Sequence, residues 1–261
     1  MKRLPLAVVL ITALTSPFSW TEEKKSGPEL LVAAAADLNP ALQDIARQFE
    51  KKTGVRVKLS FGASGSLTQQ IQNGAPYDLF FSADMEYPRQ LIARGQADAA
   101  SLRKYSLGQL VLWVPANSPL DVERRGIEAL LDVSVKKIAL ANPQHAPYGR
   151  AAVAALKHAG LYDRLSDRLV LGENVSQAAQ FAESGNAQAG FVALAHALSP
   201  ARKNTGKFWV VPPDYYPRLE QGVVVVSSSR HKKEAADFLR FLRTRDASDV
   251  LGRYGFTLPN D

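Results

Sequence analysis

The feature that most constrains the fold of this chain is a repeated alternation of short apolar runs with amphipathic segments, which starts near Pro28. Residues 30–36 form a continuous apolar run, and residues 41–51 place their apolar side chains on one helical face. Residues 55–61 then alternate apolar and polar side chains, as a half-buried strand does. Strands separated by helices favour parallel sheets that are covered by helices on both faces.

The same alternation continues to the end of the chain. It predicts further strands at 78–82, 107–115, 137–140, 169–171, 189–192, 208–211 and 222–227. It predicts further helices at 67–73, 149–159, 176–184, 231–243 and 247–254. These units are too many for one compact sheet of ordinary width. The sequence therefore predicts an α/β fold of two lobes, with parallel-rich sheets flanked by helices.

Two apolar strands, at 107–115 and 222–227, are expected to carry the chain to the second lobe and back. Lobe 1 is then discontinuous and comprises residues 29–108 plus 222–261, whereas lobe 2 comprises residues 109–221. Ligands of such folds bind beyond the carboxyl ends of the parallel strands. With two lobes that position becomes an interlobe ligand cleft, and the two crossing segments are the expected hinge.

Residues 1–20 have the form of a secretory signal peptide. Lys2 and Arg3 precede an apolar run at 4–15, which is shorter than the ~20 residues of a membrane-spanning helix. The chain has no cysteine, which excludes disulfides, thiolate metal sites and a lipid anchor on an N-terminal cysteine. We expect an exported protein of this kind, without anchor or membrane span, in the periplasm.

The positive charge of the chain does not point to nucleic acid. The formal net charge of +7 is spread along the sequence, with short doublets at 24–25, 51–52 and 124–125. Nucleic-acid-binding domains gather their cations on one face or along one helix, so we expect no nucleic acid partner. The sequence also lacks a Gly-x-Ser-x-Gly elbow and a His-Glu-x-x-His helix. It therefore predicts a protein that is not an enzyme and that carries no cofactor.

Four segments combine a strand end, a small or capping residue and a helix start. They lie at 33–40, 60–67, 142–149 and 172–176. Each exposes unpaired backbone N–H groups, and each helix start carries a partial positive charge. Taken singly, each segment is an ordinary helix cap. Their repetition at strand ends predicts that they converge in one cleft, where they bind a small anion without cationic side chains.

The chain resembles the periplasmic molybdate-binding proteins in several motifs that occur in the same order. These motifs are at 32–38, 60–67, 74–84, 142–149 and 253–256, and the resemblance runs from about Glu29 to Leu258. It implies a type II periplasmic-binding-protein fold whose lobes close on a tetrahedral oxyanion, molybdate or tungstate. It also implies delivery to the membrane subunits of an ABC importer. We expect the binding protein to be a monomer.

The resemblance also implies roles for single residues. Ser64 corresponds to a ligand serine that offers hydroxyl and amide donors, and Val175 to a backbone N–H donor at a helix start. Tyr148 falls where the family uses a small residue's amide or a tyrosine, and Ala193 replaces a tyrosine of some relatives. Asp37 stands where members have Ser or Asn. Because a carboxylate repels a dianion, we predict that Asp37 offers only its backbone amide while its side chain turns away as a helix cap.

The expected donor set has consequences for the ligand. Donors at fixed positions reject the smaller sulfate but cannot separate molybdate from tungstate. A site made of donors also favours a fully deprotonated oxyanion, because a bound proton would find no acceptor. Molybdenum or tungsten is expected only as the oxyanion, without direct metal ligands from the protein.

Three alternatives stay open on the sequence alone. The ligand could be another oxyanion, sulfate or phosphate, or a small organic anion. The adjacent Tyr215 and Tyr216 could indicate ferric-iron capture, although Pro217 beside them suits a turn before the return strand.

The four histidines are scattered along the chain, and His145 is expected to shape the loop before Tyr148.

Overall fold

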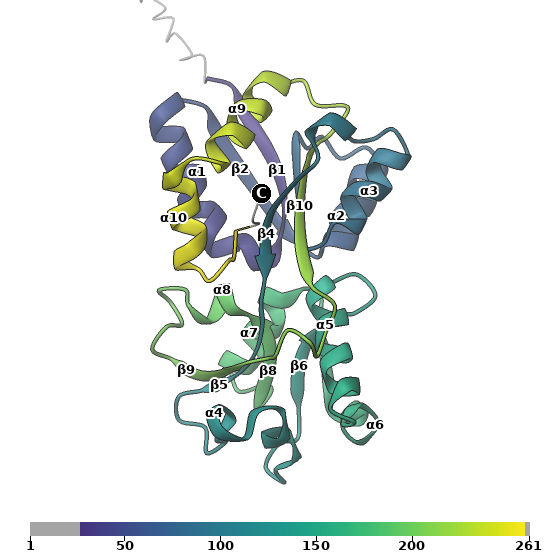
Figure 1. Ribbon diagram of the computed structural model, residues 1–261, viewed down its shortest axis with the longest axis vertical. Coiled ribbons are helices and arrows are strands. Elements are labelled where there is room, and N and C mark those ends of the chain that lie inside the picture. The colour runs from purple at the N-terminus through teal and green to yellow at the C-terminus, as the bar shows by residue number, and fades with distance from the viewer. Residues whose placement is uncertain (1–26, 259–261) are drawn as a thin grey trace, which may run out of the picture.

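The computed structural model describes residues 27–258, in which ten strands form two separate five-stranded sheets. The first sheet has the order β2-β1-β3-β10-β4 and the second the order β7-β6-β8-β5-β9. Figure 1 shows them as two lobes, one above the other along the long axis. The strands are β1 (Glu29–Ala35), β2 (Arg56–Gly62), β3 (Leu79–Ser82), β4 (Arg103–Gly108), β5 (Leu110–Pro115), β6 (Ile138–Ala141), β7 (Leu169–Gly172), β8 (Ala189–Ala193), β9 (Gly206–Val210) and β10 (Leu219–Val225).

Helices connect most of these strands. The α-helices are α1 (Asn39–Thr53), α2 (Ser64–Gln72), α3 (Glu86–Ala93), α4 (Val122–Arg125), α5 (Pro147–His158), α6 (Tyr162–Leu165), α7 (Val175–Glu183), α8 (Leu194–Ala197), α9 (Lys232–Leu242) and α10 (Arg245–Arg253). A 3₁₀ turn, η1 (Ala36–Leu38), joins β1 to α1. None of the helices in residues 27–258 is long and apolar enough to cross a bilayer. The predicted signal peptide lies outside the described residues.

Each sheet is mixed, and the antiparallel strands are those next to the lobe crossings. β1 is parallel to β2 and β3, and β6 is parallel to β7 and β8. β10 is antiparallel to β3 and β4, and β5 is antiparallel to β8 and β9. β5 and β10 are antiparallel to their neighbours because the chain enters each of them from the other lobe, and not through a right-handed helical crossover within the same sheet. The sheets are therefore parallel-rich, as expected, but not wholly parallel.

The predicted strand at 107–115 is two strands in the structure. It breaks at Gln109, which leaves β4 in the first sheet and β5 in the second. Gln109 itself contacts both lobes: its carbonyl accepts from Leu194 N–H at 2.9 Å, and its side-chain amide donates to Gly255 O at 3.2 Å. The return crossing covers residues 211–218, because β10 begins at Leu219 rather than at the predicted residue 222.

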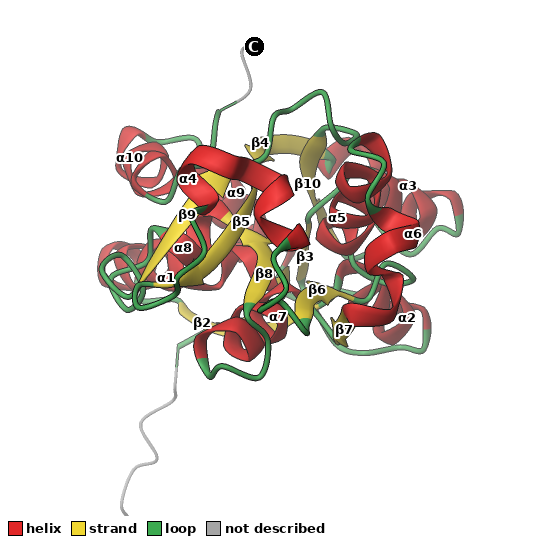
Figure 2. Cartoon of the chain, turned by 90° about the horizontal axis from the view of Figure 1, so that it is seen from below, coloured by secondary structure: helices red, strands yellow, loops and turns green. Residues whose placement is uncertain are grey.

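The central strands of each sheet are buried on both faces, as the continuous apolar runs predicted, whereas the edge strands β2, β7 and β9 are partly exposed. In β3, Phe81 packs with Phe49 and Phe238 on the side of α1 and α9, whereas its neighbour Phe80 packs with Leu91 on the side of α2 and α3. Successive strand residues point to opposite faces, so one strand serves two cores. The second lobe is built the same way, and Figure 2 shows its strands in a row with helices on either side.

Candidate functional site

The starts of four helices converge between the two lobes. β1 and β2 lead into η1 and α2, and β6 and β7 lead toward α5 and α7. Each pair of strands is parallel, so the carboxyl ends of a pair lie at the same edge of its sheet. The four helix starts surround a small cavity of about 10 Å³. It is lined by Ala35, Ala36, Asp37, Gly62, Ala63, Ser64, Ala83, Ala146, Pro147, Tyr148, Asn174 and Val175. The prediction that the four segments converge is confirmed.

The cavity presents backbone and hydroxyl donors rather than cationic side chains. The described residues that line the cavity include neither Lys nor Arg. The first N–H groups of a helix have no acceptor within the helix, and four helix starts point their partial positive charges at the same place. Such an arrangement binds a small oxyanion.

The start of α7 shows how the sequence selects one donor. Asn174 caps this helix, and its side-chain oxygen accepts from Ser176 N–H at 3.0 Å and from Gln177 N–H at 3.1 Å. The cap therefore occupies the second and third N–H groups. The N–H of Val175, the first residue of the helix, is left for a ligand. Val175 is buried and lines the cavity, which is consistent with its predicted role.

The start of α5 works in a similar way. Pro147 is its first residue and has no N–H. The N–H groups of Gly149 and Arg150 both donate to Ala146 O, at 3.0 and 3.1 Å. The amide of Tyr148, which lies between Pro147 and Gly149, is left without an intrahelical acceptor. Tyr148 can thus offer a backbone donor as well as its hydroxyl.

Ser64 is oriented for donation. Its hydroxyl oxygen accepts from Ala83 N–H at 3.0 Å, and only 1 % of the residue is exposed. Because the oxygen is occupied as an acceptor, the hydroxyl proton remains available for a ligand oxygen. The amide of Ser64 is the first of α2 and has no acceptor within that helix.

The Tyr148 hydroxyl is a buried polar group that finds no hydrogen-bond partner among residues 27–258. Burial, followed by the nearby Asp37 carboxyl, raises the pKa of Tyr148 well above its ordinary value. The phenol is therefore a neutral donor. A buried donor without a partner is costly, and a ligand oxygen in the cavity would satisfy it.

Asp37 differs from its prediction in one respect. It lies within η1 and lines the cavity, but its carboxylate does not cap a helix. Instead, Oδ2 accepts from Gln221 Nε2 at 2.5 Å, and Gln221 Oε1 accepts from Ser106 Oγ at 2.9 Å. The expected cap is wrong, because the Asp37 carboxylate is hydrogen-bonded to Gln221 of β10 instead. Gln221 is a site residue that the sequence pattern did not single out.

Several contacts close the two lobes on the cavity. Gly65 N–H, in lobe 1, donates to His145 O, in lobe 2, at 2.9 Å. Arg150 of α5 forms an ion pair with Asp84 of the first lobe and donates to the Tyr87 hydroxyl at 3.2 Å. The structure therefore shows a closed arrangement, in which His145 acts through its backbone carbonyl.

A second interlobe contact involves His196 of α8. Its Nε2 lies 3.0 Å from Ala36 O and 3.0 Å from Ser176 Oγ, which itself donates to Ala36 O at 3.1 Å. Burial lowers the pKa of His196 to about 4, so the ring is neutral and holds η1 against α7. Sequence reasoning treated His196 as one of several scattered histidines. Its place three residues after the end of β8 was the only signal.

The structure places the remaining candidate residues outside the cavity. Ala193 ends β8 and precedes α8, but it does not line the cavity. Tyr215 stacks on His158 at 4.2 Å, and the Tyr216 hydroxyl accepts from Leu110 N–H at 3.1 Å. Within residues 27–258, no group of three or more His, Cys, Asp or Glu side chains is placed to hold a metal ion. The paired tyrosines therefore have structural partners.

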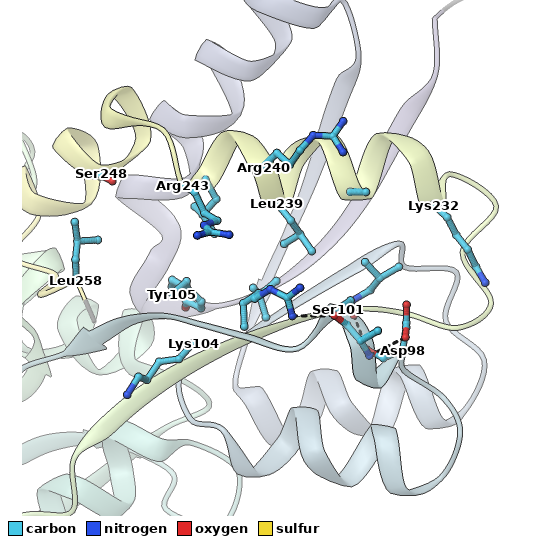
Figure 3. Close-up of a pocket in the computed structure, with 16 residues that line it drawn as sticks. Asp98, Ser101, Lys104, Tyr105, Lys232, Leu239, Arg240, Arg243, Ser248 and Leu258 are labelled. Carbon is cyan, nitrogen blue, oxygen red and sulfur yellow. Dashed lines mark hydrogen bonds between the residues drawn. The ribbon is translucent and has the colours of Figure 1, made fainter. Parts of the chain in front are cut away.

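A second cavity, of about 540 Å³, lies in lobe 1. It is a groove between β4, β10, α9 and α10, and Figure 3 shows its lining. Its cations, including Arg103, Lys232 and Arg243, are exposed at its rim. A groove of this size whose cations are exposed to solvent does not surround a small ion with donors. The interlobe cavity, with its buried lining, is the better candidate despite its small volume.

The fold and the interlobe cavity with its buried lining define a two-lobed solute-binding protein. Residues 30–257 match the family described as bacterial extracellular solute-binding protein, and the chain belongs to that family.

Its relatives include the ModA molybdate-binding proteins. That of Rhodobacter capsulatus is 36 % identical over 87 % of this chain and 88 % of its own. That of Azotobacter vinelandii is 38 % identical over 88 % of this chain and 90 % of its own. The solved structure of the Azotobacter vinelandii periplasmic molybdate-binding protein superposes with a TM-score of 0.84, at 37 % identity, covering 88 % of this chain and 100 % of that one. All of these relatives are binding proteins by name.

Proposed function

We propose that this chain is a periplasmic solute-binding protein that captures molybdate, and tungstate with it, for delivery to an ABC importer. The observation that carries the proposal is the convergence of four helix starts on one buried cavity that contains no Lys or Arg among its described lining residues. The relatives named as molybdate-binding proteins support the choice of ligand.

The proposed ligand contacts are donors from both lobes. Ser64 offers its hydroxyl and amide, Tyr148 its hydroxyl and amide, and Val175 its amide. The amide of Asp37 is the sixth donor, from a fourth residue. An oxyanion held by residues of both lobes stabilises the closed form, which is the signal that an importer would recognise. Molybdenum or tungsten enters only as the oxyanion, and no cofactor or catalytic step is part of the proposal. The expected lobe boundaries, the signal peptide and the monomeric state belong to the same proposal.

The cavity requires a small ligand. About 10 Å³ is near the minimum that admits one water molecule, so the lobes must move apart before a five-atom tetrahedral oxyanion can enter. A larger organic anion would prevent the interlobe contacts at Gly65 and Arg150. Sulfate and phosphate are therefore the alternatives that the geometry favours next. Ferric iron is disfavoured, because the paired tyrosines are occupied elsewhere.

The test is isothermal titration of the ligand-stripped protein with molybdate, tungstate, sulfate and phosphate. We expect one-to-one binding of the first two and no heat from sulfate. Binding of sulfate or phosphate with no response to molybdate would keep the transport role but overturn the ligand. No response to any of the four anions would overturn the proposed function.

A further inference from the structure

The Asp37 carboxyl is the one acidic group that the described residues contribute to the lining of the interlobe cavity. Asp37 is completely buried, and its Oδ1 has no hydrogen-bond partner among residues 27–258. Its other oxygen is held by Gln221 at 2.5 Å. The site therefore contains a fixed acceptor beside its donors, contrary to the expectation from the sequence that a ligand proton would find none.

The groups around Asp37 do not neutralise it. Tyr148 of α5 and Tyr105 of β4 are buried and protonated, because burial raises the pKa of both well above the ordinary value. His196 of α8, which contacts the carbonyl of the preceding residue, is neutral because burial lowers its pKa. Gln221 of β10 cannot titrate, and the first turns of α1 and α7 carry no titratable side chain. No described cation lines the cavity.

A bound dianion next to this carboxylate creates a conflict that one proton resolves. Two negative groups in a poorly solvated cavity repel strongly. Besides Gln221, the Tyr148 hydroxyl acts on Asp37 as a hydrogen-bond donor and lowers the pKa of its carboxyl. The one phenol proton cannot serve both the carboxyl and a ligand oxygen. A single proton between them removes one charge and supplies the missing hydrogen bond. Gln221 holds the carboxyl in place, so Asp37 cannot turn away from the ligand without losing this contact.

We propose that Asp37 couples oxyanion capture to the uptake of one proton, so that the closed complex holds a hydrogen bond between Asp37 and the ligand with the shared proton. This inference rests on the proposed function, because it needs an oxyanion in the interlobe cavity. The same overall reaction results whether the proton is assigned to the carboxyl or to the oxyanion, since the two sites are coupled. Asp37 is thus a specificity-determining residue that sets the pH range of capture.

The direction of the pH effect follows from linkage. Burial raises the pKa of Asp37 to about 6 in the closed structure without ligand, and a neighbouring dianion raises it further. Above about pH 6 the free protein must take up a proton to bind, and affinity falls about tenfold for each unit of pH until the pKa of the complex is reached. Below that pH Asp37 is already protonated, so the affinity for the dianion is constant.

The test is calorimetric titration with molybdate in two buffers of different ionisation enthalpy, at about pH 7 and about pH 8. Free molybdate is a dianion at both pH values. Any proton taken up on binding therefore reflects the formation of the complex and not the titration of free molybdate. The variant Asp37→Asn keeps the shape and the acceptor for Gln221 but cannot ionise, and Asp37→Ser removes the carboxyl altogether. Asp98→Asn, an exposed acid in lobe 1, is the matched control.

We expect the wild-type protein and Asp98→Asn to take up about one proton per oxyanion and to bind about tenfold more weakly at the higher pH. Asp37→Asn and Asp37→Ser should take up none and bind equally at both values. Wild-type binding without proton uptake, or equal uptake by the Asp37 variants, would overturn the inference and leave the proposed function intact. Absence of molybdate binding by every variant would overturn both.

Discussion

At the scale of single residues, the site consists of donors that the fold leaves without partners. The Asn174 cap occupies the amides of residues 176 and 177, and the Val175 amide remains. Pro147 removes one N–H of α5, and the Tyr148 amide remains. Helix capping, which usually satisfies these groups, here determines which of them a ligand can use.

Ser64→Ala tests the side-chain donor of lobe 1. Its hydroxyl proton is free for the ligand, and a hydrogen bond to a charged group contributes ~1.5–3 kcal/mol. We expect molybdate affinity to fall about ten- to a hundredfold in calorimetric titration. Circular dichroism should show an unchanged fold, with a small loss of stability because Ala83 N–H loses its acceptor. Unchanged affinity would remove Ser64 from the site.

Tyr148→Phe separates binding from stability. The hydroxyl lies near the Asp37 carboxyl but makes no hydrogen bond of normal geometry among the described residues, so its removal should change the melting temperature of the ligand-free protein little. Molybdate affinity should fall about tenfold or more, because a buried phenol donor is lost. A drop in melting temperature with unchanged affinity would show that the hydroxyl is structural.

Much of this site was readable from the sequence, and some was not. The four segments between strands and helices carry local signals, namely small residues, caps and Pro147. The orientation of the Asp37 carboxyl depends on Gln221, which is distant in sequence and carries no signal of its own. The same holds for His196, whose partners Ala36 and Ser176 belong to other elements. Contacts of this kind are fixed only by the packing of the elements.

At the scale of elements, α5 depends on Gly149 for its place against β6. A Cβ on Gly149 would lie 2.1 Å from Ala141 O, a backbone atom that cannot yield easily. Gly149→Ala should therefore displace the helix start that carries Tyr148. We expect a loss of ~1–3 kcal/mol in the free energy of unfolding, measured by urea denaturation, together with weaker molybdate binding.

Gly252→Ala is the matched control for this substitution. Gly252 lies in α10, and a methyl group added at its Cα would meet nothing within 4 Å. Alanine there should be neutral or should stabilise by up to ~1 kcal/mol. Similar destabilisation by both alanines would contradict the role given to Gly149.

The elements themselves were predicted better where periodicity is strong. The cores of α1, α9 and α10 lie close to the predicted ranges, because their apolar faces repeat over several turns. The break at Gln109 was missed, since β4 and β5 are adjacent apolar strands that differ only in the sheet they join. Helix α3 was also missed: Pro88 in its first turn resembles a breaker, yet proline is tolerated there.

At the scale of the whole molecule, closure is stabilised by contacts outside the ligand site. Arg150 and Asp84 bridge the lobes, and the Asp84 side chain is only 16 % exposed. Arg150→Met should favour the open form and weaken molybdate binding about three- to tenfold, with a larger effect at low salt. Small-angle X-ray scattering of the ligand-free variant should give a larger radius of gyration.

Lys104→Met is the control for the bridge variant. Lys104 pairs with Glu220 at 3.2 Å, and both residues belong to the first sheet. Its loss should therefore leave closure and affinity unchanged. Equal effects of both substitutions would show that Arg150 acts through net charge rather than through the bridge.

The most direct test of the proposed interlobe site is a crystal structure of the molybdate complex with anomalous data at the molybdenum edge. We expect one strong peak between the helix starts at Ser64, Tyr148 and Val175, with contacts from both lobes. A peak in the basic groove of lobe 1 that Figure 3 shows, with an empty interlobe cavity, would contradict the proposal.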